Sequence, residues 1–182
     1  MSGIRTVIPD ENLSVENGLA NNYVKDITQD GKGFIWIATE TGLSRFDGQT
    51  FTNYTIDNSQ LNNDAINKLL YDPYDNLLWI GTRSALSIYD YSTQQITNFN
   101  PKPGIPVGNI VDLELAGDSA IWIVNHNHGI VHLNKQTRKL VHYSGKNIDG
   151  LRNTNWCVCD DKKGNLYIGH AQNGFTILDL VT

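Results

Sequence analysis

A repeating block with one aromatic residue at a fixed place constrains the fold of this chain more than any other feature. The aromatic residues are Trp36, Trp79, Trp122 and Tyr167, which lie 43, 43 and 45 residues apart. Around each one, short runs of β-branched and aromatic residues alternate with turn sequences such as Asp47–Gly48. Helical repeats of this length would instead place apolar residues every three to four positions. The repeat therefore predicts the four-stranded antiparallel blades of an all-β propeller.

Four such repeats use nearly all of the 182 residues. We expect one β-propeller segment with blades at approximately 21–55, 63–100, 107–144 and 153–182. Residues 4–9 have the register of an outermost fourth strand, whereas the last repeat stops before its own fourth strand. Propellers remove exposed strand edges by letting one terminus complete a blade begun by the other. The sequence therefore predicts closure through residues 4–9.

Three forms of closure are compatible with this pattern. One chain could close on itself, although four blades make a tight ring. Two chains could exchange their N-terminal strands and form an eight-blade ring with twofold symmetry. An open fragment of a larger propeller would expose apolar blade faces. We favour the homodimer formed by strand exchange.

Within each repeat the turn residues delimit the strands, and no helix is predicted. Three of the four third strands follow a glycine, namely Gly42, Gly129 and Gly174, while Ala85 stands at this place in the second repeat. Inner strands are predicted at 23–28, 66–71, 109–115 and 155–160, second strands at 34–38, 77–81, 120–124 and 166–169, and third strands at 43–46, 86–89, 130–133 and 175–178.

Composition excludes several classes of protein. The formal net charge is −5 and the Lys and Arg residues form no cluster, which argues against nucleic-acid binding because phosphate contacts need concentrated positive charge. No run of 18 apolar residues occurs, so we expect no membrane contact in this segment. Cys157 and Cys159 lie two apart in a strand, a geometry unsuited to a disulfide, and we expect buried or half-buried thiols.

Residues that recur in phase are assigned to structure, because a true site residue should break the repeat. We expect the recurring aromatic residues to pack between neighbouring blades. A polar residue also recurs after each third strand, and we expect it to form turn hydrogen bonds rather than to bind Ca²⁺, which needs several oxygens on one loop. These polar residues are Asp47, Asp90, Asn134 and Asp179.

The residues that break the repeat gather in two kinds of loop. Propeller connectivity places the loops between second and third strands on the same rim as the segments that lead into the inner strands. Amides, imidazoles, one guanidinium and one indole on this rim suit hydrogen bonding to, and stacking on, a sugar, although the same set also suits a plain polar surface. The candidate ligand-binding residues are Arg83, Asn125, His126, His128, Asn155, Trp156, His170 and Gln172, with Asn22, Asn63, Ser84, Asn109 and Asn173 beside them.

The same rim also carries histidines and carboxylates, the residue types of metal and catalytic sites. His126, His128 and His170 could be interpreted as metal ligands, but no cysteine or carboxylate motif accompanies them, and loop histidines on a polar rim are the commoner explanation. Glu40 and Asp64 are the main carboxylates of these loops and form no evident acid/base pair. No phosphate-binding glycine loop or nucleophile elbow is present. We therefore predict no catalytic residue, no metal and no cofactor.

The first repeat resembles a known family. The block DGKGFIWIAT, from Asp30 to Thr39, is followed by Gly42 and by the Phe46–Gly48 turn, and it closely resembles the two-component regulator propeller repeat. The lead-in at 13–24 resembles the same family, and the resemblance covers essentially the whole chain. It weakens in the third repeat, which has Asn125 to His128 after its Trp, and in the fourth, which has Tyr167 in place of Trp.

In that family, such repeats form the periplasmic sensor region of hybrid two-component histidine kinases, which detect nutrients and often glycans. The resemblance implies a non-enzymatic sensor module, with an oligosaccharide as the expected ligand and a phosphorelay in the parent protein. No kinase domain, phosphoacceptor helix or receiver domain is present in these residues. The alternatives are a protein-interaction scaffold that uses the rim or an open blade edge, and a propeller lyase or hydrolase.

Overall fold

The computed structural model describes residues 12–99, 108–172 and 174–180. It contains four antiparallel sheets whose strands are hydrogen-bonded in sequence order, which confirms the predicted all-β propeller. Blade one consists of β1 (Val24–Gln29), β2 (Ile35–Thr39), β3 (Gly42–Phe46) and β4 (Phe51–Tyr54). Blade two consists of β5 (Ile66–Asp72), β6 (Leu77–Thr82), β7 (Leu86–Asp90) and β8 (Gln95–Phe99).

Blade three consists of β9 (Ile110–Ala116), β10 (Ala120–Asn125), β11 (Gly129–Asn134) and β12 (Leu140–Tyr143). Blade four has three strands among the described residues, β13 (Asn155–Asp160), β14 (Asn165–His170) and β15 (Phe175–Asp179). The strands lie within one residue of their predicted ends, because turn residues mark them clearly. The predicted closing strand at 4–9 falls outside the described residues.

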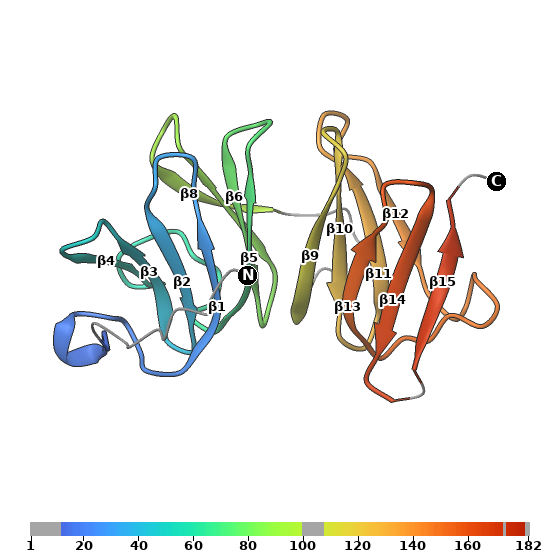
Figure 1. The fold of residues 1–182 in the computed structure, drawn as a ribbon, viewed down its shortest axis with the longest axis horizontal. Coiled ribbons are helices and arrows are strands. Elements are labelled where there is room, and N and C mark those ends of the chain that lie inside the picture. The colour runs from blue at the N-terminus through green and yellow to red at the C-terminus, as the bar shows by residue number, and fades with distance from the viewer. Residues whose placement is uncertain (1–11, 100–107, 173, 181–182) are drawn as a thin grey trace, which may run out of the picture.

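The inner strands β1, β5, β9 and β13 contact one another in this order, so the blades form an arc. Figure 1 shows blades one and two in the left half of the view and blades three and four in the right half, with β5 and β9 neighbouring each other between them. We call the face of a blade that is turned toward the following blade its front face, and the face turned toward the preceding blade its back face.

The core consists of three apolar clusters, one at each junction between blades. Trp36, Trp79 and Trp122 are buried in these clusters, on the front faces of blades one to three, as predicted. Each indole faces the aliphatic back face of the next blade; Trp36, for example, packs near Leu69 and Ile80 of blade two. Packing between blades, rather than within one sheet, therefore holds the arc together.

Turn chemistry explains why the strands end where they do. Asp30 accepts hydrogen bonds from the N–H groups of Lys32 (2.9 Å) and Phe34 (3.0 Å), which closes the hairpin before β2. The predicted turn role after the third strands is confirmed at Asp47, which accepts from the N–H of Thr50 at 2.7 Å. At Gly129, which has φ +87°, a Cβ would lie 2.2 Å from the carbonyl oxygen of Tyr143, so only glycine fits.

Two expectations from the sequence are wrong. A short 3₁₀ helix, η1 (Val15–Asn17), is present in the lead-in, where Ser14 and Asn17 form a capping box. Cys157 and Cys159 are exposed rather than buried. Both pair with β14 residues on the front face of blade four, which has no following blade among the described residues. Within the described ranges, the four blades are therefore arranged as an open arc (Figure 1).

Candidate functional site

A β-bulge interrupts the pairing of every inner strand with its second strand, close to where the inner strand begins. The register shifts between Val24 and Asp26 in blade one and at the corresponding place in the other three blades. A bulge leaves one residue outside the ladder and re-aims its side chain. The four bulged residues are Lys25, Asn67, Val111 and Trp156.

All four bulged side chains line a single hollow of about 460 Å³. Four further residues complete its wall, namely Tyr23, Arg83, Asn109 and His126. Tyr23 and Asn109 come from the segments that lead into inner strands, whereas Arg83 and His126 come from the loops between second and third strands. The hollow thus collects residues from all four blades at the predicted rim.

Backbone hydrogen bonds tie this rim together from blade to blade. The N–H of Asn109 donates to the carbonyl of Arg83 (2.7 Å), and the N–H of His126 donates to the carbonyl of Asn109 (3.2 Å). The N–H of Asn155 then donates to the carbonyl of His126 (3.1 Å). The hollow is therefore built on a backbone that connects blades two, three and four.

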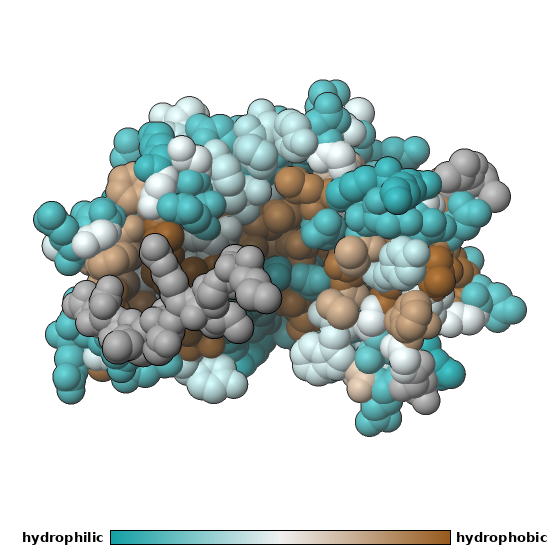
Figure 2. Space-filling view, viewed as in Figure 1, coloured by the Kyte–Doolittle hydropathy of each residue, from teal (hydrophilic) through white to brown (hydrophobic). Residues whose placement is uncertain are grey.

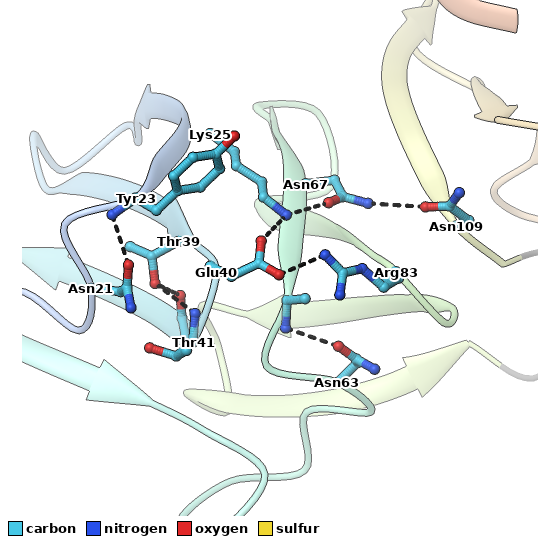
Figure 3. A network of polar contacts seen from close by, with 12 residues as sticks. Asn21, Tyr23, Lys25, Thr39, Glu40, Thr41, Asn63, Asn67, Arg83 and Asn109 are labelled. Carbon is cyan, nitrogen blue, oxygen red and sulfur yellow. Dashed lines mark hydrogen bonds and ion pairs between the residues drawn. The ribbon is translucent and has the colours of Figure 1, made fainter.

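A polar network forms the wall on the side of blades one and two (Figure 3). The Glu40 carboxylate lies between the Lys25 ammonium, with which it forms an ion pair, and Arg83 Nη2 at 2.5 Å. Lys25 Nζ also donates to Asn67 Oδ1 (2.9 Å). Asn67 Nδ2 in turn donates to the carbonyl of Ile110 (2.9 Å), so the network runs from blade one to blade three.

The hydrogen bond and charge of Lys25, together with Arg83, hold the pKa of Glu40 below its ordinary value. Glu40 is therefore ionised at neutral pH and offsets one of the two positive charges. Because Glu40 is not itself among the lining residues, the wall of the hollow presents amides and cations to a ligand. This side suits hydrogen bonding to hydroxyl and carboxylate oxygens.

The wall on the side of blades three and four is aromatic. Trp156 is half exposed, and its ring lies 4.5 Å from the ring of His126 at an interplanar angle of 49°. On the side of blade one, beside the polar network, Tyr23 is also exposed, with the Lys25 ammonium 6.0 Å from its ring centre. The buried Nδ1 of His126 has no hydrogen-bond partner among the described residues. An unsatisfied polar atom beside an exposed indole is a feature that a bound ligand would explain.

Three of the predicted site residues, Arg83, His126 and Trp156, line the hollow. Asn125 and Asn155 are fully buried below the rim. The Asn125 side chain accepts from the N–H of Gly108 (3.0 Å), and Asn155 Oδ1 lies 2.8 Å from His170 Nδ1. These two amides are therefore held by the fold, although each has a buried Nδ2 without a partner in the described part of the chain.

His170, His128 and Gln172 do not line the hollow. His170 stands where Thr39 and Thr82 stand in blades one and two, and its two ring nitrogens contact Asn155 and Thr176, both at 2.8 Å. Burial, aided by the nearby charge of Arg152, lowers the pKa of His170. His128 and Gln172 are exposed on loops outside the hollow.

The sequence pointed to the rim but missed three of the bulged residues, Lys25, Asn67 and Val111. A signal for them existed, because each follows the first residue of an inner strand, yet their side chains share no chemistry. Hydrophobic patterning does not detect a bulge, since it reports only which residues face inward. Within the described ranges, no three His, Cys, Asp or Glu side chains come close enough together to hold a metal ion.

Part of the first blade matches a known protein family. Residues 18–41 match the family model described as two component regulator propeller. The chain carries this propeller repeat. The matched residues include Tyr23 and Lys25, which line the hollow, and Glu40, which forms an ion pair with Lys25. A search of curated protein sequences finds no match.

Solved structures similar to this propeller segment include two extracellular domains from Bacteroides thetaiotaomicron. The extracellular domain of the hybrid two component system BT3049 is 32% identical, with a TM-score of 0.87 over 93% of this chain and 25% of that one. The extracellular domain of BT4673, described as a one component system, is 23% identical, with a TM-score of 0.71 over 95% of this chain and 22% of that one. The segment thus spans about a quarter of these chains.

A computationally designed protein, Ika4, shares the fold alone. It is 12% identical, with a TM-score of 0.63 over 98% of this chain and 99% of that one. Among the described residues of the present segment, no helix is long and apolar enough to cross a membrane.

Proposed function

We propose that this propeller segment is a non-catalytic, ligand-binding part of the extracellular sensor domain of a hybrid two-component histidine kinase. We further propose that it binds an oligosaccharide in the hollow at the rim. The family repeat and the similarity to the BT3049 extracellular domain support the sensor role and an extracytoplasmic location. The parent kinase would relay the signal through its phosphorelay domains.

The four β-bulges are the observation that supports the hollow as the binding site. The four bulges occur at the same place in each blade, yet they aim a cation, an amide, an aliphatic side chain and an indole into one hollow. Positions that only maintain the repeat keep their chemistry, as Trp36, Trp79 and Trp122 do. A position with constant geometry and variable chemistry is what a binding surface on a repeat scaffold requires.

The chemistry of the wall favours a carbohydrate. An exposed indole offers a flat apolar surface to the C–H face of a sugar ring, and Trp156 provides it. The amides of Asn67 and Asn109 and the guanidinium of Arg83 can exchange hydrogen bonds with ring hydroxyls. The lining residues include no carboxylate, whereas glycoside hydrolysis ordinarily uses a pair of them. Binding, rather than turnover, is therefore the proposed activity.

The polar network also offers a route by which binding could be communicated. Lys25 of blade one, Asn67 of blade two and Ile110 of blade three are joined directly by hydrogen bonds. A ligand that competes for Lys25 or Asn67 would alter the contacts between the inner strands of three blades. The proposed signal is thus a change in how neighbouring blades pack.

The test is calorimetric titration of a panel of short neutral and uronate-containing oligosaccharides into the chain and its variants. We expect at least one sugar to bind. We expect Trp156→Ala to weaken its binding about tenfold, because losing one aromatic contact costs on the order of 1 kcal/mol. Arg83→Ala should weaken binding in the same direction.

Tyr74→Ala serves as the matched control, since Tyr74 is an exposed aromatic residue outside the hollow and should not affect binding. Sugar binding that survives unchanged in both Trp156→Ala and Arg83→Ala would place the ligand elsewhere and overturn the proposed site. Release of reducing ends from any sugar in the panel would overturn the non-catalytic role.

A further inference from the structure

A second cavity, of about 350 Å³, lies between blades one and two, at the other end of the strands from the hollow. Blade one contributes the hairpin between β1 and β2 and part of β3, and blade two contributes β7 and the turn after it. In the view of Figures 1 and 2, the hairpin between β1 and β2 points upward, and mostly hydrophilic side chains lie along this upper edge. The lining residues are Lys32, Phe34, Arg45, Tyr89, Tyr91 and Gln94.

Arg45 is the lining residue that breaks the repeat. It stands opposite Trp36 where β3 pairs with β2. The corresponding residues of blades two, three and four are Ile88, His132 and Ile177. The repeat therefore requires no guanidinium at this place, and a residue that departs from a repeat is a candidate for binding.

The Arg45 guanidinium is partly buried and forms no ion pair or hydrogen bond with any residue that the structure describes. The other buried or partly buried cations in the described ranges each form an ion pair with an Asp or a Glu; they are Lys25, Lys68 and Lys135. A guanidinium carries five N–H donors, and withdrawing a charged group from water without a partner is costly. Arg45 therefore lacks the anion that comparable cations of this chain have.

Aromatic rings hold the Arg45 guanidinium in place. Its central carbon lies 4.8 Å from the centre of the Phe34 ring and 5.8 Å from that of Trp36. Stacking uses the flat faces of a guanidinium and leaves the N–H groups at its edge able to bind a carboxylate. Lys32 adds a second positive charge, and no carboxylate is among the described lining residues. The cavity is therefore suited to an anion.

The wall from blade two is aromatic. Tyr89 and Tyr91 are buried, with their ring centres 5.0 Å apart. The Tyr91 hydroxyl is buried and completes no hydrogen bond among the described residues, although the Asp30 carboxylate lies near it. Burial, and next this carboxylate, raise the pKa of Tyr91, so the hydroxyl keeps its proton. The cavity thus combines two cations with aromatic rings and a phenol donor.

We propose that this cavity binds a small aromatic carboxylate, whose carboxylate group pairs with Arg45 and Lys32 while its ring packs against the aromatic lining. An inorganic anion would satisfy the cations but leave the aromatic surface uncovered. The volume lies at the lower end of the range for ligand pockets, which suits a molecule with one ring rather than an oligosaccharide. The site is separate from the sugar hollow and does not depend on it.

Calorimetric titration with three probes tests the two parts of the ligand separately. We expect 4-hydroxybenzoate to bind with a millimolar or lower dissociation constant. Its methyl ester keeps the ring without the charge, and acetate keeps the charge without the ring, so each should bind at least about tenfold more weakly. The proposal is overturned if neither 4-hydroxybenzoate nor phenylacetate binds at millimolar concentration, or if the ester binds as tightly as the acid.

The repeat itself supplies a variant that should fold. Arg45→Ile introduces the residue that blades two and four have at this place, and it should weaken 4-hydroxybenzoate binding about tenfold or more and abolish the preference for acid over ester. Lys32→Gln, at an exposed residue, should weaken binding about threefold. A preference for the acid that survives in Arg45→Ile would contradict the proposal.

Arg138→Gln is the matched control. The Arg138 guanidinium also lies beside a ring, 5.5 Å from the centre of Phe99, but outside the cavity, so this variant should bind as the wild type does. Trp156→Ala should also leave binding unchanged; a loss there would place the probe in the sugar hollow and overturn the assignment. In NMR spectra of arginine Nε–H groups, 4-hydroxybenzoate should shift the Arg45 signal and not that of Arg138. An unmoved Arg45 signal at saturation would overturn the proposal.

Discussion

The junction between blades two and three and the junction between blades three and four use the same repeat positions with different polar chemistry. In the first, buried Lys135 pairs with Asp72 at 2.7 Å, and Asp72 also accepts from the indole N–H of Trp79 at 3.2 Å. In the second, Ala116 and Leu180 stand at the places of Asp72 and Lys135. The indole N–H of Trp122 accordingly has no partner among the described residues.

The difference shows that a blade junction needs the apolar packing of its Trp but can form without the polar contacts. At both junctions the Trp packs in an apolar cluster. The Asp72–Lys135 ion pair and the hydrogen bond that the indole donates to Asp72 are present at the first junction and have no counterpart at the second among the described residues. Burial alone would lower the pKa of Lys135, but Asp72 and Asp75 outweigh it and raise that pKa, so Lys135 stays charged at neutral pH. We infer that apolar packing defines the blade junction and that the ion pair reinforces one junction.

The largest effect is expected from Asp72→Ala. This change leaves the buried Lys135 with only Asp75, whose carboxylate is partly exposed, so we expect the free energy of unfolding to fall by about 3 kcal/mol. Urea unfolding measures the loss. Asp161→Ala, at the same place in blade four, is the control and should cost much less, since among the described residues Asp161 bonds only to its own turn. Equal costs would remove the distinction between the two junctions.

A smaller difference in stability is expected between Trp→Phe variants at Trp36 and at Trp122. Trp36 Nε1 donates to Asp30 at 2.8 Å, whereas Trp122 Nε1 has no partner in the described part of the chain. Both indoles are buried, so Trp→Phe removes similar packing from each. We therefore expect Trp36→Phe to cost about 1–2 kcal/mol more than Trp122→Phe. If urea midpoints shift equally, the indole hydrogen bond contributes nothing to the junction.

The smallest expected effect is a loss of folding stability at acid pH. Burial lowers the pKa of His132 and of His170 below the ordinary 6.5, and the nearby charge of Arg152 lowers that of His170 further. Below about pH 6.5 the unfolded chain binds protons that the folded chain does not, so stability should fall as the pH drops through that window. Arg152→Ala should raise the pKa of His170 in an NMR titration. An unchanged pKa would contradict this electrostatic account.

His132 and His170, the two histidines whose pKa values are lowered, lie in blades three and four. Acid should therefore loosen the C-terminal half of the arc before the N-terminal half. Hydrogen exchange at about pH 7 and about pH 5 would show this as faster exchange in β13 and β14 than in β5 and β6. Equal changes in both halves would contradict it.

The sequence determined the fold closely because the repeat signal is redundant. Asp–Gly turns, β-branched strands and the 43-residue spacing of Trp36 and Trp79 all indicate the same blade. Burial on the outer faces of blades one and four was harder to predict, because a buried apolar residue and an exposed one look alike in sequence. Cys157 and Cys159 were accordingly expected to be buried and are exposed.

The sequence also indicated the rim, but it did not indicate most of the bulged residues that line the hollow. Arg83, His126 and Trp156 stood out because they break the repeat, and the structure brings them to one hollow. Lys25 and Asn67 were missed because their direction depends on a bulge, which arises from hydrogen-bond register rather than from hydrophobic pattern. His170 breaks the repeat in residue type only, because the fold uses it where blades one and two use Thr.

The most direct test of the binding hollow is tryptophan fluorescence quenching during sugar titration. Trp36, Trp79 and Trp122 are buried, so an aqueous quencher should reach only Trp156, which is 50% exposed. We predict that a bound oligosaccharide protects the fluorescence of the wild type from acrylamide and has no such effect in Trp156→Phe. If no sugar in the neutral and uronate-containing panel gives protection, or if the protection persists in Trp156→Phe, the hollow is not the binding site.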